Sequence, residues 1–142
     1  MTTREQMSEA AEHEGGHTKL MRAALQGQTE TVKTLLGSAA DVNQSDDEGR
    51  TALMFAVANM QTDSAKALLE HGANVNATTN DGFTALILAA SCGYSEIIQG
   101  LLRKGADVSG KFTQTGMTAL MLAREKDYTQ IVQLLEAAEA KQ

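Results

Sequence analysis

The sequence has 142 residues, of which 42% are hydrophobic and 21% charged, so it suits one globular domain with its own core. Aromatic residues make up only 4%, and Trp and Pro are absent, which favours helices over strands. The net charge of −6 works against non-specific nucleic-acid binding and against contact with an acidic membrane surface.

The cysteine content and the N-terminus predict a cytoplasmic location. Cys92 is the only cysteine, so no internal disulfide forms and the fold must rest on packing in a reducing compartment. The first residues carry no apolar run of the kind found in secretory signals, and no segment is long and apolar enough for a membrane span. We therefore expect a soluble protein without a cofactor.

In chain order, a polar segment over residues 1–15 comes first, and we expect it to form a capping helix with Thr2 or Thr3 at its start. Four similar segments follow, at 16–48, 49–81, 82–115 and 116–142. Each segment carries the pattern Gly-x-Thr-x-Leu. The threonines of successive segments are spaced 33, 33 and 34 residues apart. These threonines are Thr18, Thr51, Thr84 and Thr118.

The chemistry of one segment predicts a pair of helices. Gly-x-Thr reads as a turn followed by a hydroxyl that caps a short first helix. In the third segment this helix carries Ala89 and Ala90, which are small enough for a second helix to pack closely. The corner glycine Gly93 permits a left-handed turn. The second helix then presents apolar residues at helical spacing, namely Ile97, Ile98, Leu101 and Leu102.

This combination of period, Gly-x-Thr-x-Leu and the linkers AADVN (39–43), GANVN (72–76) and GADVS (105–109) resembles the ankyrin repeat. The resemblance covers residues 16 to about 136. It implies an all-α fold, an ankyrin-repeat solenoid of four stacked helix-turn-helix units with projecting hairpin loops, forming a single domain over 1–142. The Thr-Ala-Leu-Met variant of the motif is similar to that of bacterial repeats.

Four places depart from the pattern. Ala39 replaces the glycine after the second helix, so we expect Gly37 to reshape that turn. Met60 and Asp127 replace corner glycines. Asp127 tolerates a left-handed conformation, but Met does not adopt it readily, so we expect Asn59 to adopt it in place of Met60. The loop at 109–115 is one residue longer than its counterparts and should bulge differently.

One short motif suggests catalysis. His13, Glu14 and His17 form a formal H-E-x-x-H match, which on a helix binds zinc with the Glu as general base. Gly15 and Gly16 lie inside the motif and each costs about 1 kcal/mol in a helix, and no third ligand is evident. We therefore expect no metal site and no enzymatic activity, although a metal-dependent hydrolase remains the alternative.

Other candidates have simpler interpretations. Met21, Met54 and Met121 recur at the repeat period with Ile87 in register, and we interpret them as packing between successive first helices. The acidic run Asp46, Asp47 and Glu48 is interpreted as a solvated loop tip, with a basic partner as the alternative.

The family resemblance implies that a protein partner binds in a groove of loop tips and first-helix ends. Phe83 and Met117 are large apolar groups at such tips, with Phe112 and Tyr94 near them in register, as in a binding hot spot. We expect an adaptor or regulatory subunit, monomeric by itself; an inhibitor, immunity protein or assembly subunit is the alternative. The predicted partner-binding residues are Asp47, Glu48, Arg50, Asn59, Asn80, Asp81, Phe83, Ser91, Cys92, Tyr94, Phe112, Thr115, Met117, Glu125 and Lys126.

Overall fold

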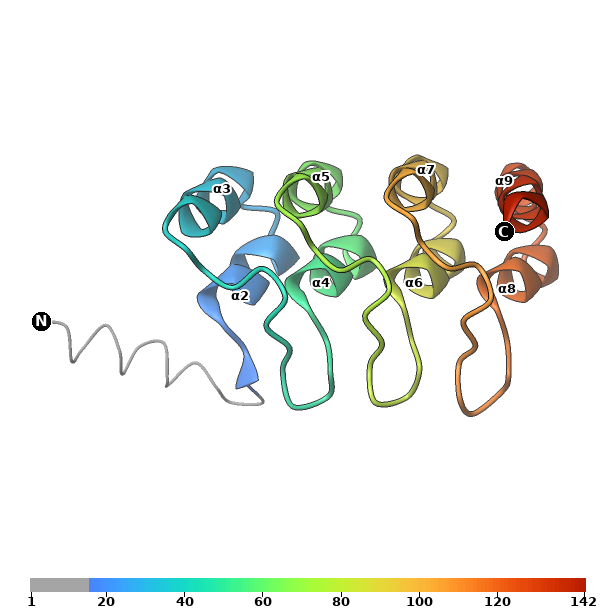
Figure 1. Ribbon diagram of the computed structural model, residues 1–142, viewed down its shortest axis with the longest axis horizontal. Helices are drawn as coiled ribbons and strands as arrows, with labels where there is room; N and C mark the ends of the chain where they lie inside the picture. The colour runs from blue at the N-terminus through green and yellow to red at the C-terminus, as the bar shows by residue number, and fades with distance from the viewer. Residues whose placement is uncertain (1–15) are drawn as a thin grey trace, which may run out of the picture. The chain divides into compact units, whose positions relative to one another are not determined.

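A computed structural model describes residues 16–142 and divides the chain into two compact units, residues 1–73 and 74–142 (Figure 1). The described part of the chain contains helices and no strand, apart from an isolated antiparallel bridge between Ser45 and Thr51. The predicted all-α fold is therefore confirmed. The capping helix expected at 1–15 lies outside the described residues. Between residues 16 and 142, no helix is long and apolar enough to cross a membrane.

Each unit holds two helix pairs arranged in two layers (Figure 1). In the first unit, α2 (Lys19–Leu25) packs beside α4 (Ala52–Ala58), and α3 (Thr29–Gly37) packs beside α5 (Thr62–Glu70). In the second unit, α6 (Ala85–Cys92) packs beside α8 (Ala119–Glu125), and α7 (Ser95–Arg103) packs beside α9 (Thr129–Lys141). Hairpin loops project from the start of the first helices, away from the second helices (Figure 1).

The four threonines begin the first helices as predicted. Each has an extended backbone, and its hydroxyl accepts a hydrogen bond from the amide three residues later. The distances are 3.1 Å at Thr18, 3.4 Å at Thr51, 3.1 Å at Thr84 and 3.2 Å at Thr118. Such a cap satisfies an amide that has no partner inside the helix, and its loss typically costs about 1 kcal/mol.

Alanines bring the helices of each unit close together. Ala24 and Ala56 are fully buried in the first unit, and Ala90 and Ala123 in the second. A larger side chain at these places would hold neighbouring helices apart, because interior packing leaves little free volume. In the second-helix layer of the first unit, the buried Ser64 hydroxyl pairs with the Thr29 hydroxyl at 3.0 Å. The core therefore lies between repeats as much as within them.

Two predictions about the turns are wrong. Met60 itself adopts the left-handed conformation with φ 58°, while Asn59 has φ −101°. Ala39 is likewise left-handed with φ 70°, and Gly37 is simply the last residue of α3. Asp127 takes its corner at φ 59°, as expected. The cause at Met60 is the helix ending: its amide and that of Gln61 donate to the carbonyls of Val57 and Ala56, which fixes the turn.

The interpretation of the recurring methionine position as packing between first helices is confirmed at three of its four places. Met21, Met54 and Ile87 are at most 3% exposed. Met121, in contrast, is 47% exposed, so its interpretation as packing between first helices is wrong. The reason is its place on α8, since no described helix lies against the side of α8 that faces away from α6.

The third hairpin differs from the others as its extra residue predicts. In the two shorter loops, the amides of Asp46 and Thr79 donate to carbonyls four residues later. In the longer loop, the amide of Phe112 donates to the carbonyl of Met117, five residues later. The amide of Gly116 then closes the wider turn onto Phe112 at 2.7 Å.

A glycine in place of Met60 should relieve the backbone strain of the left-handed turn there. We expect Met60→Gly to raise the free energy of unfolding by about 0.5–1 kcal/mol, because the left-handed cost of a Cβ exceeds the extra chain entropy of glycine. Little packing is lost, since Met60 is 49% exposed. Met60→Ala keeps the Cβ and should show no such gain. Urea unfolding of both variants measures the difference, and a less stable glycine variant would contradict the account.

Candidate functional site

Two aromatic rings meet at neighbouring hairpins of the second unit. Phe83 and Phe112 stack with their ring centroids 4.2 Å apart and an interplanar angle of 27°. Both side chains are half-buried, so each ring covers part of the other while the pair stays accessible. The predicted proximity of these residues is therefore borne out by the geometry. Stacked aromatic pairs of this kind contribute about 0.5–1.5 kcal/mol beyond the area they bury.

The two hairpins also touch through their backbones. The amide of Thr113 donates to the carbonyl of Asp81 at 2.9 Å. Next to it, Gly82 has φ 90°, and a Cβ built there would come within 2.8 Å of the Lys111 carbonyl oxygen. Only glycine fits both the conformation and the close approach. The aromatic pair thus sits on a backbone contact that holds the two tips together.

The other predicted tip residues of the second unit are close in sequence to Phe83 or Phe112. Met117 is half-buried beside the α8 cap, and its amide donates to the Thr115 hydroxyl at 3.2 Å. The exposed residues are Asn80, Asp81 and Thr115. Tyr94, in contrast, follows the far end of α6, about 12 Å from the Phe83 end by helix length. Tyr94 therefore does not join the aromatic pair.

Residues at the ends of the first helices link neighbouring repeats. In the second unit, Lys126 Nζ donates to the carbonyl of Ser91 at 3.2 Å, and in the first, Asn59 Nδ2 donates to the carbonyl of Leu25 at 3.0 Å. Both bonds satisfy a carbonyl at a helix end. Cys92 is half-buried, in no disulfide, and Glu125 is exposed. Lys126 and Asn59 thus have a structural contact as well as an accessible surface.

In the first unit, a polar cluster joins the segment just before α2 to the hairpin that precedes α4. The side chain of Asp46 is fully buried and accepts hydrogen bonds from the amides of Glu48 and Arg50 at 2.9 and 2.8 Å. Arg50 Nε lies 2.8 Å from its second oxygen, and His17 Nε2 lies 3.3 Å from that same oxygen. The interpretation of Asp46 as part of a solvated tip is therefore wrong, because Arg50 and His17 enclose it; Asp47 and Glu48 are exposed as expected.

Burial by itself would raise the pKa of Asp46. Hydrogen bonds from the Arg50 amide and side chain and from the Glu48 amide, together with the Arg50 charge, outweigh it and hold the pKa below the ordinary value of 3.8. A lowered folded-state pKa means that the carboxylate stabilises the fold above the unfolded pKa, and that this stabilisation is lost as the pH falls through the folded pKa. The stabilisation by Asp46 is therefore lost at pH values below about 4.

Sequence reasoning missed the apolar residues four positions after the capping threonines. Phe55 is half-buried under the Arg50 guanidinium, whose carbon lies 5.0 Å from the ring centroid, and His17 meets the ring edge-on at 5.4 Å. Phe55 therefore lies on the same side of α4 as the tips. Leu88 and Leu122 hold the same register in α6 and α8 and are also half-buried. Their recurrence four residues after the capping threonines is the sequence signal that indicates this face of the first helices.

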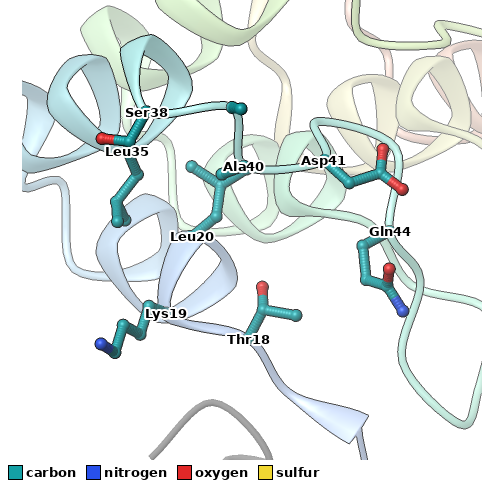
Figure 2. Close-up of a pocket in the computed structure, with 9 residues that line it drawn as sticks. Thr18, Lys19, Leu20, Leu35, Ser38, Ala40, Asp41 and Gln44 are labelled. Carbon is teal, nitrogen blue, oxygen red and sulfur yellow. The ribbon is translucent and has the colours of Figure 1, made fainter. Parts of the chain in front are cut away.

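A hollow of about 510 Å³ lies on the first repeat, between α2 and the segment after α3 (Figure 2). Leu35 points from α3 toward α2, and Leu20 points from α2 toward Ala40. The equivalent of Leu35 in the next repeat is Leu68. It is fully buried on α5, a helix that packs against α3 and α4, whereas Leu35 is half-buried. The hollow thus reflects the repeat register rather than a converging set of reactive groups.

The H-E-x-x-H segment is only partly described. His13 and Glu14 lie outside the described residues, and Gly16 is left-handed with φ 80°, which a helix through the motif would not allow. His17 contacts Asp46, Arg50 and Phe55 instead of pointing into open solvent. From residue 16 onward, no three His, Cys, Asp or Glu side chains lie together as a metal site would need.

Removing the charge of Asp46 tests the polar cluster. We expect Asp46→Asn to lower the free energy of unfolding by about 1–3 kcal/mol at pH 7, because an amide nitrogen would then face the Arg50 donor. The deficit should shrink as the pH falls below about 4, because the wild-type carboxylate takes up a proton in the unfolded chain first and loses its stabilising effect as the pH passes through the lower pKa of the folded state. Denaturant unfolding at pH 7 and pH 3 measures both effects. Asp47→Asn, on the same loop but exposed, is the matched control and should change stability by less than about 0.5 kcal/mol.

Comparison with known proteins agrees with this architecture. A family model described as ankyrin repeats (3 copies) matches residues 20–112 and 79–141, which together span most of the chain. No curated protein matches the sequence. The period, the capped first helices, the left-handed corners and this match lead to one conclusion: the chain belongs to the ankyrin repeat family.

Proposed function

We propose that this protein is an adaptor or regulatory subunit that docks another protein through its hairpin tips and the exposed sides of its first helices. Ankyrin repeats are generally protein–protein interaction modules, and the family is typically non-enzymatic. The fold by itself names no partner, so the argument must come from the surface. A single cysteine in no disulfide supports a cytoplasmic location.

The observation that carries the proposal is the stacked pair of Phe83 and Phe112. Half-exposed aromatic rings on a fixed backbone offer a large contact area with little conformational entropy to lose. Exposed polar residues border the rings, as at the rim of a protein interface. We assign to this surface of the second unit Asn80, Asp81, Phe83, Phe112, Thr115 and Met117, with Ser91, Cys92, Tyr94, Glu125 and Lys126 along the first helices.

The first unit offers a surface of a different kind. Arg50 is held by Asp46 and lies over Phe55, so its guanidinium is fixed while its side chain stays 36% exposed. A pre-positioned arginine loses less entropy when it binds a carboxylate or a carbonyl of a partner. We assign Asp47, Glu48, Arg50 and Asn59 to the contacts that this unit contributes, and we add Phe55 to them.

Removing the apolar tip tests the assignment in the second unit. We expect Phe83→Ala combined with Met117→Ala to weaken binding of the native partner by about 2 kcal/mol or more, roughly 30-fold. Because Phe83 also stacks on Phe112, the variant should lose about 1 kcal/mol of stability as well. Binding should therefore be measured with partner purified from native lysate, at a temperature where both proteins are fully folded.

The matched control changes two exposed residues of the second helices. Glu70→Ala combined with Gln130→Ala removes the same number of side chains from places outside the proposed surface and should leave affinity unchanged. Unaltered affinity of the Phe83/Met117 variant, alongside its loss of stability, would sink the assignment. The lifetime and stoichiometry of the wild-type complex separate transient regulation from an inhibitor or a permanent assembly subunit.

A further inference from the structure

The helix α9 differs from the other second helices in length and in what it borders. It has 13 residues, against nine in α3, α5 and α7. Its additional turns run alongside the C-terminal end of α7 and form one wall of a hollow of about 390 Å³. This hollow lies on the second-helix layer of the second unit, so it is separate from the tip surface proposed above.

The floor of the hollow is apolar and shallow. Leu102 of α7 and Leu134 of α9 are half-buried there. Ala137 and Ala138 continue the stripe along α9, and their small side chains allow another backbone to approach. Residues 134, 137, 138 and 141 follow the i, i+3, i+4, i+7 pattern, which runs about 10 Å along one face.

The border of the hollow is cationic. Arg103 and Lys141 line it, both are exposed, and within the described residues neither side chain makes an ion pair or hydrogen bond. Among the described residues that line the hollow there is no Asp or Glu side chain. The nearby Glu136 is already paired with Arg124 of α8 at 2.6 Å. Arg103 and Lys141 thus lack an acidic side chain as a partner, although the chain as a whole has a net charge of −6.

The corresponding groove of the first unit shows the contrast. Between α3 and α5, Lys33 and Lys66 alternate with the carboxylates of Glu30, Asp63 and Glu70. Lys33 lies 3.7 Å from Glu30, and three carboxylates line this groove with the two lysines, so its cations have counter-charges beside them. It also lacks leucine side chains. The apolar floor and the uncompensated cations are thus specific to α7 and α9.

The walls of the hollow are held in place. The side chain of Gln142 reaches the linker after α7, where its Nε2 donates to the carbonyl of Ala106 at 3.0 Å and its Oε1 accepts from the amide of Val108 at 3.4 Å. The Arg124–Glu136 ion pair ties the middle of α9 to α8. A preformed surface binds with less loss of entropy than one that must be ordered on binding.

We propose that this hollow docks an acidic amphipathic helix of a partner protein. Such a helix lays apolar residues at i, i+3 or i+4 and i+7 into a groove between two helices, and its flanking carboxylates pair with Arg103 and Lys141. An extended segment fits less well, because the backbone groups of α7 and α9 are already bonded within their helices. The geometry makes this a second docking surface, independent of the tips.

The experiment uses a synthetic capped peptide of roughly 14 residues with leucines on one face and glutamates beside them, and a second peptide with lysines in place of the glutamates. Calorimetry with the full chain should show binding of the glutamate peptide. Arg103→Glu combined with Lys141→Glu should weaken it about tenfold, and the same variant should gain affinity for the lysine peptide. Both residues are exposed, so the fold should tolerate the change.

Lys33→Glu combined with Lys66→Glu is the matched control, since it reverses two cations in the groove of the first unit and should leave glutamate-peptide binding unchanged. Backbone NMR shifts should fall at residues 99–103 and 134–142. The proposal is overturned by absent binding to the wild type, by equal binding of both peptides, or by shifts confined to the tips. It is also overturned if the chain self-associates through this groove and the charge-reversed variant does not, because a second copy would then be the occupant.

Discussion

The structure depends on contacts between neighbouring repeats. A single helix pair of this chain cannot bury its own apolar face, since α2, α4, α6 and α8 are short and their buried sides are mostly alanine and leucine. Burial becomes complete only where a first helix of one repeat lies against that of the next, as α2 does with α4 and α6 with α8. Met121 shows the consequence: it occupies the register of the buried Met54 and yet is half-exposed, because no described helix lies against it.

The same contacts fix the surface that we propose for binding. Left-handed glycines let chain segments approach until a Cβ would not fit. The aromatic pair forms where the two hairpins of the second unit meet, and the Asp46 cluster where the segment before α2 meets the hairpin before α4. Tip residues far apart in sequence are thereby held in a defined arrangement, and between residues 16 and 142 no strand or disulfide joins them. The scaffold is repetitive, and the variable residues of the tips and helix faces carry the specificity.

Much of the fold could be read from the sequence, because caps and turns are local. The spacing of Thr18, Thr51, Thr84 and Thr118 located all four first helices, and the extra residue at 109–115 located the wider hairpin. The conformations of Ala39 and Met60 were misjudged, since a residue's own preference was weighed without the helix-ending hydrogen bonds that override it.

The candidate site was harder to predict because it depends on partners distant in sequence. Asp46 looked like one of three solvated acids, and only the contact with His17, 29 residues earlier, together with Arg50 shows that it is buried. Phe112 was correctly placed near Phe83 by register, whereas Tyr94 was not, because the length of α6 separates them. The cationic hollow between α7 and α9 depends on the length of α9, which no single sequence motif predicts.

Amide hydrogen exchange of the chain, alone and in complex with the partner isolated from native lysate, tests the central claim most directly. If the tips dock a protein, exchange should slow on binding at the amides of Phe83, Phe112 and Thr113, which lie in the contacting hairpins of the second unit. Unchanged exchange at these amides in a saturated complex, with protection elsewhere in the chain, would contradict the proposed binding surface.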